Sequence, residues 1–193
     1  MTTALSRDTY FETGLAVLSD LGYGGLKLAE VCARLRVTSG SFYHYFANWA
    51  EYTEGLLAYW LEARTIRAIE LLTSIPDPRE RLTTIIDVGL SLPHGAERAI
   101  RTWSNLDDRA RRTQEMVDLK RYEVVFSSVA ELVGDTQLAH HFANWSVFLL
   151  VGYEQTSLPQ DRDSLRDIML RLMEVLEESS AAGENGDGLR HVR

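Results

Sequence analysis

Prolines are scarce in this chain, and their scarcity constrains the fold more than any other feature. Only four occur among 193 residues, at Pro76, Pro78, Pro93 and Pro159. Proline interrupts a helix because it lacks the amide hydrogen and its ring clashes with the preceding turn. The stretches between the prolines are rich in Ala, Leu, Glu and Arg, and their apolar residues recur at helical spacing. The sequence therefore predicts an all-α protein, without a convincing strand pattern in competition.

Capping residues indicate where the helices begin. Thr38 is a good N-cap, and Asn48 with Glu51 resembles a capping box, in which an acidic third residue reaches back to the cap. Asp77 is a further N-cap candidate, and Pro78 after it would occupy the first helical position. Together with the apolar periodicity, these signals predict helices over residues 7–21, 28–35, 38–46, 48–72, 80–90, 96–104, 107–132, 136–156 and 163–178.

The charge balance excludes a protein whose whole surface is basic and binds nucleic acid without specificity. The net charge is −8 and the pI is about 5.1. Residues 1–60 hold four basic and six acidic residues, so the deficit reaches the N-terminal segment. The uncharged stretch from Phe142 to Tyr153 is shorter than the ~20 residues that cross a bilayer. With no signal-peptide pattern at the N-terminus and a single cysteine, Cys32, we expect a cytoplasmic protein.

The segment from residue 28 to residue 46 carries the most functional information. Two short predicted helices joined by Arg36-Val37-Thr38 follow the helix-turn-helix plan, in which the second helix enters the DNA major groove. Residues 7–57 resemble the TetR/AcrR family of bacterial transcriptional regulators. The residues that carry the resemblance are Arg7, Tyr10-Phe11, Leu18, Gly22-Tyr23 and the run from Val37 to Phe46, whose FYHYF sequence is the most specific part.

The resemblance implies a two-part organisation. A three-helix DNA-binding head over residues 1–50 would join a larger helical ligand-binding and dimerisation domain over residues 51–178, with a disordered tail over residues 179–193. Phe42 and Phe46 lie four residues apart on one helical face, so we expect them to pack on Val31 and Leu35 in the core of the head.

Short hydroxyl side chains around the second helix are suited to phosphates and base edges. On their own these side chains would favour a capped, solvated helix over a DNA contact. With the resemblance, Tyr43 corresponds to a phosphate-contacting tyrosine. The predicted DNA-binding residues are Lys27, Arg36, Thr38, Ser39, Gly40, Ser41, Tyr43, His44 and Asn48.

This head departs from the family pattern in its charges. Ala47 and Trp49 stand where a lysine is usual, Lys27 replaces a Ser/Thr cap, and Arg36 replaces a turn glycine. Because phosphate neutralisation supplies most non-specific affinity, we expect modest DNA affinity and a shallow salt dependence.

The second part offers a dimer interface and an effector pocket. The stretch from Phe142 to Tyr153 is apolar nearly all round, and the last predicted helix has apolar residues at core spacing. The alternative is that both helices are buried within a monomer. The predicted dimer contacts are Phe142, Leu149, Leu165, Ile168, Met169, Leu172 and Leu176. The predicted pocket residues are Tyr59, Trp103, Asn105, Arg121, Tyr122, Phe126, Asn144, Trp145, Phe148 and Glu154.

The predicted function is a ligand-responsive regulator, a repressor, that binds a pseudo-palindromic operator as a homodimer and is released by a small apolar or amphipathic effector. The alternative is a dimeric small-molecule-binding or protein-interaction module with a weakened DNA-binding head. No catalytic, metal or cofactor motif is evident: Asp107-Asp108 fits a helix cap, and the adjacent His140 and His141 do not share one helical face. We therefore expect no enzymatic activity, no metal or cofactor, and no membrane partner.

Overall fold

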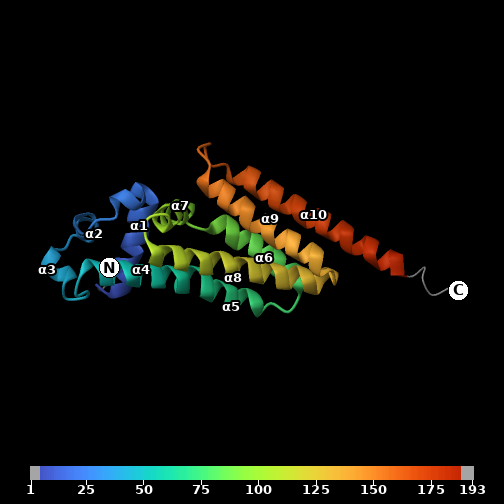
Figure 1. The fold of residues 1–193 in the computed structure, drawn as a ribbon, viewed down its shortest axis with the longest axis horizontal. Helices are drawn as coiled ribbons and strands as arrows, with labels where there is room; N and C mark the ends of the chain where they lie inside the picture. The colour runs from blue at the N-terminus through green and yellow to red at the C-terminus, as the bar shows by residue number, and fades with distance from the viewer. Residues whose placement is uncertain (1–4, 188–193) are drawn as a thin grey trace. The chain divides into compact units, whose positions relative to one another are not determined.

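The computed structural model describes residues 5–187, with the backbone alone described for residues 180–187. These residues form helices joined by turns and loops and contain no strand, which confirms the predicted all-α class (Figure 1). The helices are α1 (Arg7–Gly25), α2 (Leu28–Leu35), α3 (Ser39–Phe42), α4 (Trp49–Leu61), α5 (Arg67–Thr73), α6 (Pro78–Ser91), α7 (His94–Ser104), α8 (Asp108–Val133), α9 (Thr136–Gln155) and α10 (Arg162–Asp187), with a π-helical turn η1 (Glu62–Ile66) between α4 and α5.

The predicted N-caps are present. The Thr38 hydroxyl accepts a hydrogen bond from the Ser41 amide at 3.3 Å, and Asn48 Oδ1 accepts one from the Glu51 amide at 2.9 Å. Asp77 Oδ1 accepts from the Arg79 amide at 3.1 Å. Each cap satisfies an amide that the helix itself cannot pair, so three of the helix starts could be read from the sequence.

Four differences from the predicted boundaries stand out. Helix α1 continues to Gly25, across a kink at Gly22, where the sequence predicted an end at residue 21. The helix expected over residues 48–72 is interrupted by η1, where the backbone takes an extra residue per turn. The third helix ends at Phe42, and a turn follows to Tyr45. The tail expected to be disordered from Ser179 is helical as far as Asp187; residues 188–193 lie outside the described residues.

The chain forms two compact units, and each is described by itself. The first unit comprises residues 1–67 and 93–117, and the second comprises residues 68–92 and 118–193. This grouping rests on packing alone, and the functional boundary at residue 50 stays a prediction.

Aromatic residues form the core of the first unit. Tyr10, Phe42 and Phe46 are almost completely buried, and the Tyr10 ring lies 5.8 Å from Phe42 and 5.5 Å from Phe46. Val31 belongs to the same cluster and Leu35 packs against it, as predicted. The helix-turn-helix segment is therefore fixed on α1 by large apolar contacts.

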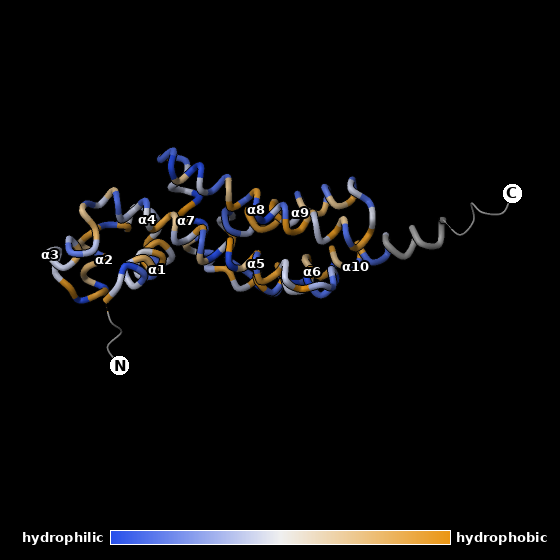
Figure 2. Tube along the Cα trace, turned by 90° about the horizontal axis from the view of Figure 1, so that it is seen from below, coloured by the Kyte–Doolittle hydropathy of each residue, from blue (hydrophilic) through white to orange (hydrophobic). Residues whose placement is uncertain are grey.

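Helix α7 packs closely against α1 in the first unit. A Cβ atom added to Gly95 would lie 2.8 Å from the Ser19 carbonyl oxygen, so only glycine allows this approach. The buried Trp60 indole of α4 donates to Glu97 Oε1 at 2.8 Å, and Tyr23 stacks on Trp103 at 5.0 Å. Figure 2 shows apolar residues gathered where α1 and α7 lie together.

The second unit has its own apolar core, to which α5, α6, α8, α9 and α10 contribute. Leu72, Leu82, Val129, Phe142 and Leu176 are buried in it. The Arg81 side chain is almost fully buried and donates to the Ile75 carbonyl at 2.8 Å and 3.0 Å and to Glu131 at 2.8 Å. This guanidinium fixes the turn between α5 and α6 to α8.

A glycine substitution tests the kink near the end of α1. Gly22 has φ +67° and ψ −176°, a conformation that other residues reach only with strain. Gly22→Ala is expected to lower the free energy of unfolding by about 1–3 kcal/mol, measured by urea denaturation. Gly24→Ala is the matched control, because Gly24 has an ordinary φ and open space around it. Equal stability of the two variants would contradict the strain argument.

Candidate nucleic-acid interface

The predicted DNA-binding residues lie on the surface of the first unit. All except Ser41 are exposed, and Tyr43 exposes 54% of its surface. Ser41 is half-buried because the Tyr10 hydroxyl donates to its Oγ at 3.5 Å. Phe42, between Ser41 and Tyr43, is fully buried, so the aromatic core holds α3 while its polar neighbours face solvent.

The turn between α2 and α3 depends on Arg36. This residue has φ +56°, in the left-handed region that usually takes glycine at a helix end. Its amide donates to the Ala33 carbonyl at 3.1 Å, and the Val37 amide donates to the Cys32 carbonyl at 3.0 Å. The turn therefore forms without glycine and presents a cation beside α3.

Carboxylates neutralise two of the cations in this head. Arg7 donates to Glu51 Oε1 at 2.9 Å and to the Tyr45 carbonyl at 2.7 Å. Arg34 pairs with Asp20 at 2.6 Å and with Glu30 at 2.8 Å. The Ala47 amide and the Arg7 guanidinium lower the pKa of the Glu51 carboxyl, which therefore stays ionised near neutral pH.

Lys27 and Arg36 are the remaining cations of the head. Both are exposed, and among the described residues neither forms an ion pair with a carboxylate. Arg34, in contrast, is held by Glu30 of its own helix and by Asp20 of α1. Among the described residues, the head therefore has two cations without a carboxylate partner.

The acidic excess belongs to the second unit. The first unit contains eleven basic and eleven acidic residues, whereas the second contains nine basic and seventeen acidic residues over its full sequence range. The whole net charge of −8 is therefore carried by the second unit. The unit with the helix-turn-helix segment is neutral, although its first 60 residues are slightly acidic.

The predicted pocket residues are divided between the two units. In the first unit, Tyr59 donates to Glu12 Oε1 at 2.5 Å. Burial is the main cause that raises the pKa of Tyr59 to about 12, and this hydrogen bond is the second cause. Trp103 is 2% exposed, and its Nε1 has no hydrogen-bond partner. Asn105 is exposed at the end of α7. Glu12 also binds Arg64 of η1 at 2.8 Å, so α1 is tied to the end of α4.

In the second unit, the predicted pocket residues are mostly at the surface or in half-buried positions. Tyr122 stacks on Phe126 and bonds His140, which in turn contacts Asn144. Arg121 is half-buried and Glu154 is fully buried. Trp145 and Phe148 are exposed and do not enclose a cavity.

An apolar groove lies between α9 and α10. Its volume is about 590 Å³. Its lining residues are Trp145, Phe148, Leu149, Gly152, Tyr153, Thr156, Leu158, Pro159, Asp161, Ser164, Leu165, Ile168 and Leu172. Sequence reasoning missed the turn residues Leu158 and Pro159, although an exposed Leu-Pro pair between two apolar helices was a usable signal.

The predicted dimer contacts divide into two groups. Leu149, Leu165, Ile168 and Leu172 line the groove. Phe142 and Leu176 are buried in the core of the second unit, and Leu165, at the groove floor, is also buried. Met169 is half-buried, and its Cε lies 3.7 Å from a Cβ built on Gly89 of α6. Helical periodicity located the apolar faces but could not separate the face turned inward from the face turned outward.

The acidic pair before α8 is a helix cap. Asp107 Oδ1 accepts from the Arg109 and Ala110 amides at 2.8 Å and 3.3 Å, and Asp108 pairs with Arg111. The Arg109 side chain lowers the pKa of Asp107, and the Arg111 side chain lowers that of Asp108. Groups that stay ionised are poor general acids, which fits the predicted capping role.

The described residues contain no group of three or more potential ligands placed to hold a metal ion. None of their helices has the length and apolar character needed to cross a membrane.

The architecture defines a class of protein: an all-α chain with a helix-turn-helix head and a larger helical remainder. Residues 11–51 match the family model described as bacterial regulatory proteins, tetR family. The resemblance expected from the sequence is confirmed over residues 11–51, the span that the family model matches. No curated protein matches the sequence.

Solved structures extend the likeness to nearly the whole chain. A protein from Saccharomonospora viridis, described as a transcriptional regulator in complex with choline, has a TM-score of 0.71 and 17% identity, covering 87% of this chain and 95% of that one. A protein from Rhodococcus sp., described as a TetR-family regulator, has a TM-score of 0.65 and 15% identity over 88% and 97% of the two chains. FadR from Bacillus subtilis, in complex with stearoyl-CoA, has a TM-score of 0.62 and 14% identity over 90% and 99%. At these identities the likeness establishes the fold.

Proposed function

We propose that the protein is a ligand-responsive repressor that binds a pseudo-palindromic operator as a homodimer and is released by a small apolar or amphipathic effector. The observation that carries the DNA-binding part is the exposed polar surface around α3, formed by Thr38, Ser39, Tyr43 and His44, with the buried Phe42 behind it. Lys27 and Arg36 supply the electrostatic anchors. A single short recognition helix reads few bases, so two heads on two half-sites are the general solution.

The groove between α9 and α10 supports self-association. Phe148 projects from α9 beside a groove that includes Gly152 and Ser164, so the same surface offers a large apolar side chain and a recess. A two-fold contact requires this kind of self-complementarity, because each copy presents the same patch to the other. Exposed Trp145, Leu158 and Ile168 extend the patch.

The first unit supports an effector-controlled head. Trp103 Nε1 is a buried donor without a partner, which a ligand oxygen would satisfy. Trp103 stacks on Tyr23 of α1, and the helix that bears it packs against α1 through Gly95. A ligand at this indole would therefore act on the helix that holds the head. The effector must bind the DNA-incompetent state more tightly, because equal affinity for both states shifts nothing.

The experiment is a titration of the purified protein with DNA from its own upstream region at low salt, read by electrophoretic mobility and footprinting. Two protected half-sites about one helical turn apart are expected. Retention without sequence selectivity would instead favour the ligand-binding or interaction module with a weakened head. Loss of the footprint on addition of candidate metabolites then identifies the effector.

Tyr43 provides a direct test of the interface. Its exposed hydroxyl has no protein partner among the described residues, so it is free to donate to a phosphate. Tyr43→Phe keeps the ring on Phe42 and is expected to lower operator affinity by about 1 kcal/mol, roughly fivefold, for each head. The measurement is fluorescence anisotropy at fixed salt, and unchanged affinity removes Tyr43 from the phosphate contacts.

A further inference from the structure

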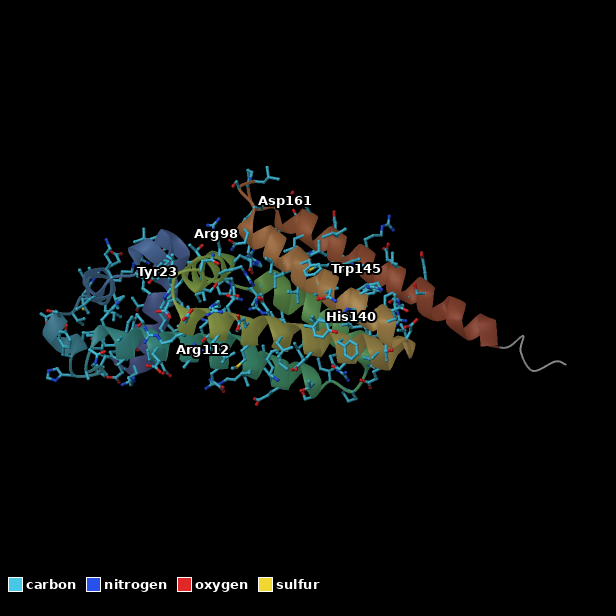
Figure 3. All side chains as sticks on the ribbon, viewed as in Figure 1. Tyr23, Arg98, Arg112, His140, Trp145 and Asp161 are labelled. Atoms are coloured by element: carbon cyan, nitrogen blue, oxygen red, sulfur yellow. The ribbon has the colours of Figure 1, made fainter. Side chains whose placement is uncertain are left out.

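Two adjacent histidines interrupt an otherwise uncharged surface of α9. Between the capping Asp135 and Tyr153, His140 and His141 are the only titratable residues in the sequence. Both are exposed, and Figure 3 shows His140 and Trp145 along the same helix. The His141 ring stacks on Trp145 with centroids 5.9 Å apart, and Trp145 lines the groove proposed for self-association. His141 therefore borders the proposed interface, and the His140 ring lies next to it, with centroids 5.9 Å apart.

His140 contacts α8 and its own helix. Its Nδ1 lies 2.8 Å from the Tyr122 hydroxyl, and Asn144 Nδ2 lies 3.1 Å from Nε2 and donates to the His140 carbonyl at 2.9 Å. An amide nitrogen can only donate, so a proton on Nε2 would require the Asn144 amide to rearrange.

Nothing around the two rings compensates a positive charge. Tyr122 is the only titratable side chain of α8 that contacts His140, and no carboxylate forms an ion pair with either imidazole among the described residues. On the surrounding elements, Asp135 caps α9, Lys120 pairs with Glu123 on α8, Arg171 pairs with Glu174 on α10, and Arg79 of α6 pairs with Glu177.

We propose that self-association of this chain through the α9–α10 groove is gated by pH, with the dimer formed when His140 and His141 are neutral and weakened when they are protonated. This inference rests on the proposed dimer. Covering Trp145 with a second copy would remove water from the stacked His141 ring, and burial penalises the charged imidazole. Two copies would also bring like charges to one interface.

The test is the dimer dissociation constant at about pH 8 and about pH 5.5, measured by sedimentation equilibrium with the full chain. The wild-type constant is expected to rise at least about tenfold at the lower pH, because like charges brought together at an interface oppose binding. The His140→Gln/His141→Phe variant keeps a polar side chain at 140 and a ring on Trp145, and it should lose this pH dependence. His44→Gln, on the head, is the matched control and should retain it.

The outcomes are separable. A wild-type dimer with the same constant at both pH values overturns the gating and leaves the dimer standing. The same pH dependence in the double variant also overturns it. A wild-type chain that is monomeric at both pH values overturns the proposed dimer and the gating with it. Circular dichroism at both pH values establishes that the chains are folded when compared.

Discussion

The Lys27→Gln/Arg36→Gly variant is expected to bind operator DNA at least about 100-fold more weakly than the wild type at moderate salt. Lys27 and Arg36 are the cations of the head that no carboxylate neutralises, whereas Arg7 and Arg34 are paired. Each phosphate contact contributes about 0.9 to the slope of log affinity against log salt. Four contacts in a dimer therefore predict that the slope becomes shallower by about 3 to 4.

The substitutions are chosen so that unfolding does not explain the loss. Arg36 has φ +56°, which glycine adopts more easily than arginine, so the turn should be at least as stable in the variant. The matched control is Arg111→Gln/Arg171→Gln, which changes the net charge equally by removing paired cations of α8 and α10. Fluorescence anisotropy over a salt series gives the slope of log affinity against log salt for the variant and for the control. An unchanged slope in the first variant would place the phosphate contacts elsewhere.

The head could be predicted from sequence because its determinants are local. Thr38 and Asn48 cap the helices that follow them, and α2 has the predicted bounds because its apolar stripe ends where Arg36 turns the chain. Phe42 and Phe46 were placed in the core by their spacing alone, and the structure buries both.

What the sequence concealed depends on distant contacts. No residue near η1 predicts a π-helical turn. Arg64 within this turn nevertheless forms an ion pair with Glu12 of α1. The need for glycine at position 95 becomes evident only when the structure places Ser19 against it. The same limit explains Trp145 and Phe148: periodicity marked them as apolar, but only packing shows that they face outward into a groove. Their assignment to an effector pocket stays a prediction that the groove does not favour.

The Phe148→Asp variant is expected to raise the dimer dissociation constant by at least about 100-fold. Phe148 is 66% exposed in the single chain, so a carboxylate there is solvated in the monomer. In the dimer, two such carboxylates would be buried without partners, and an uncompensated buried charge costs about 3–5 kcal/mol. Operator affinity should fall in parallel, because separated heads occupy the half-sites independently.

Leu71→Asp is the matched control for this prediction. Leu71 of α5 is 71% exposed and lies outside the groove, so the same change in charge should leave both self-association and operator binding intact. Size-exclusion chromatography with light scattering gives the mass of each variant, and anisotropy gives its operator affinity. A Phe148→Asp chain that stays dimeric would show that the copies meet through another surface. A monomeric chain with undiminished operator affinity would separate DNA binding from dimerisation, leaving the groove free for a different partner.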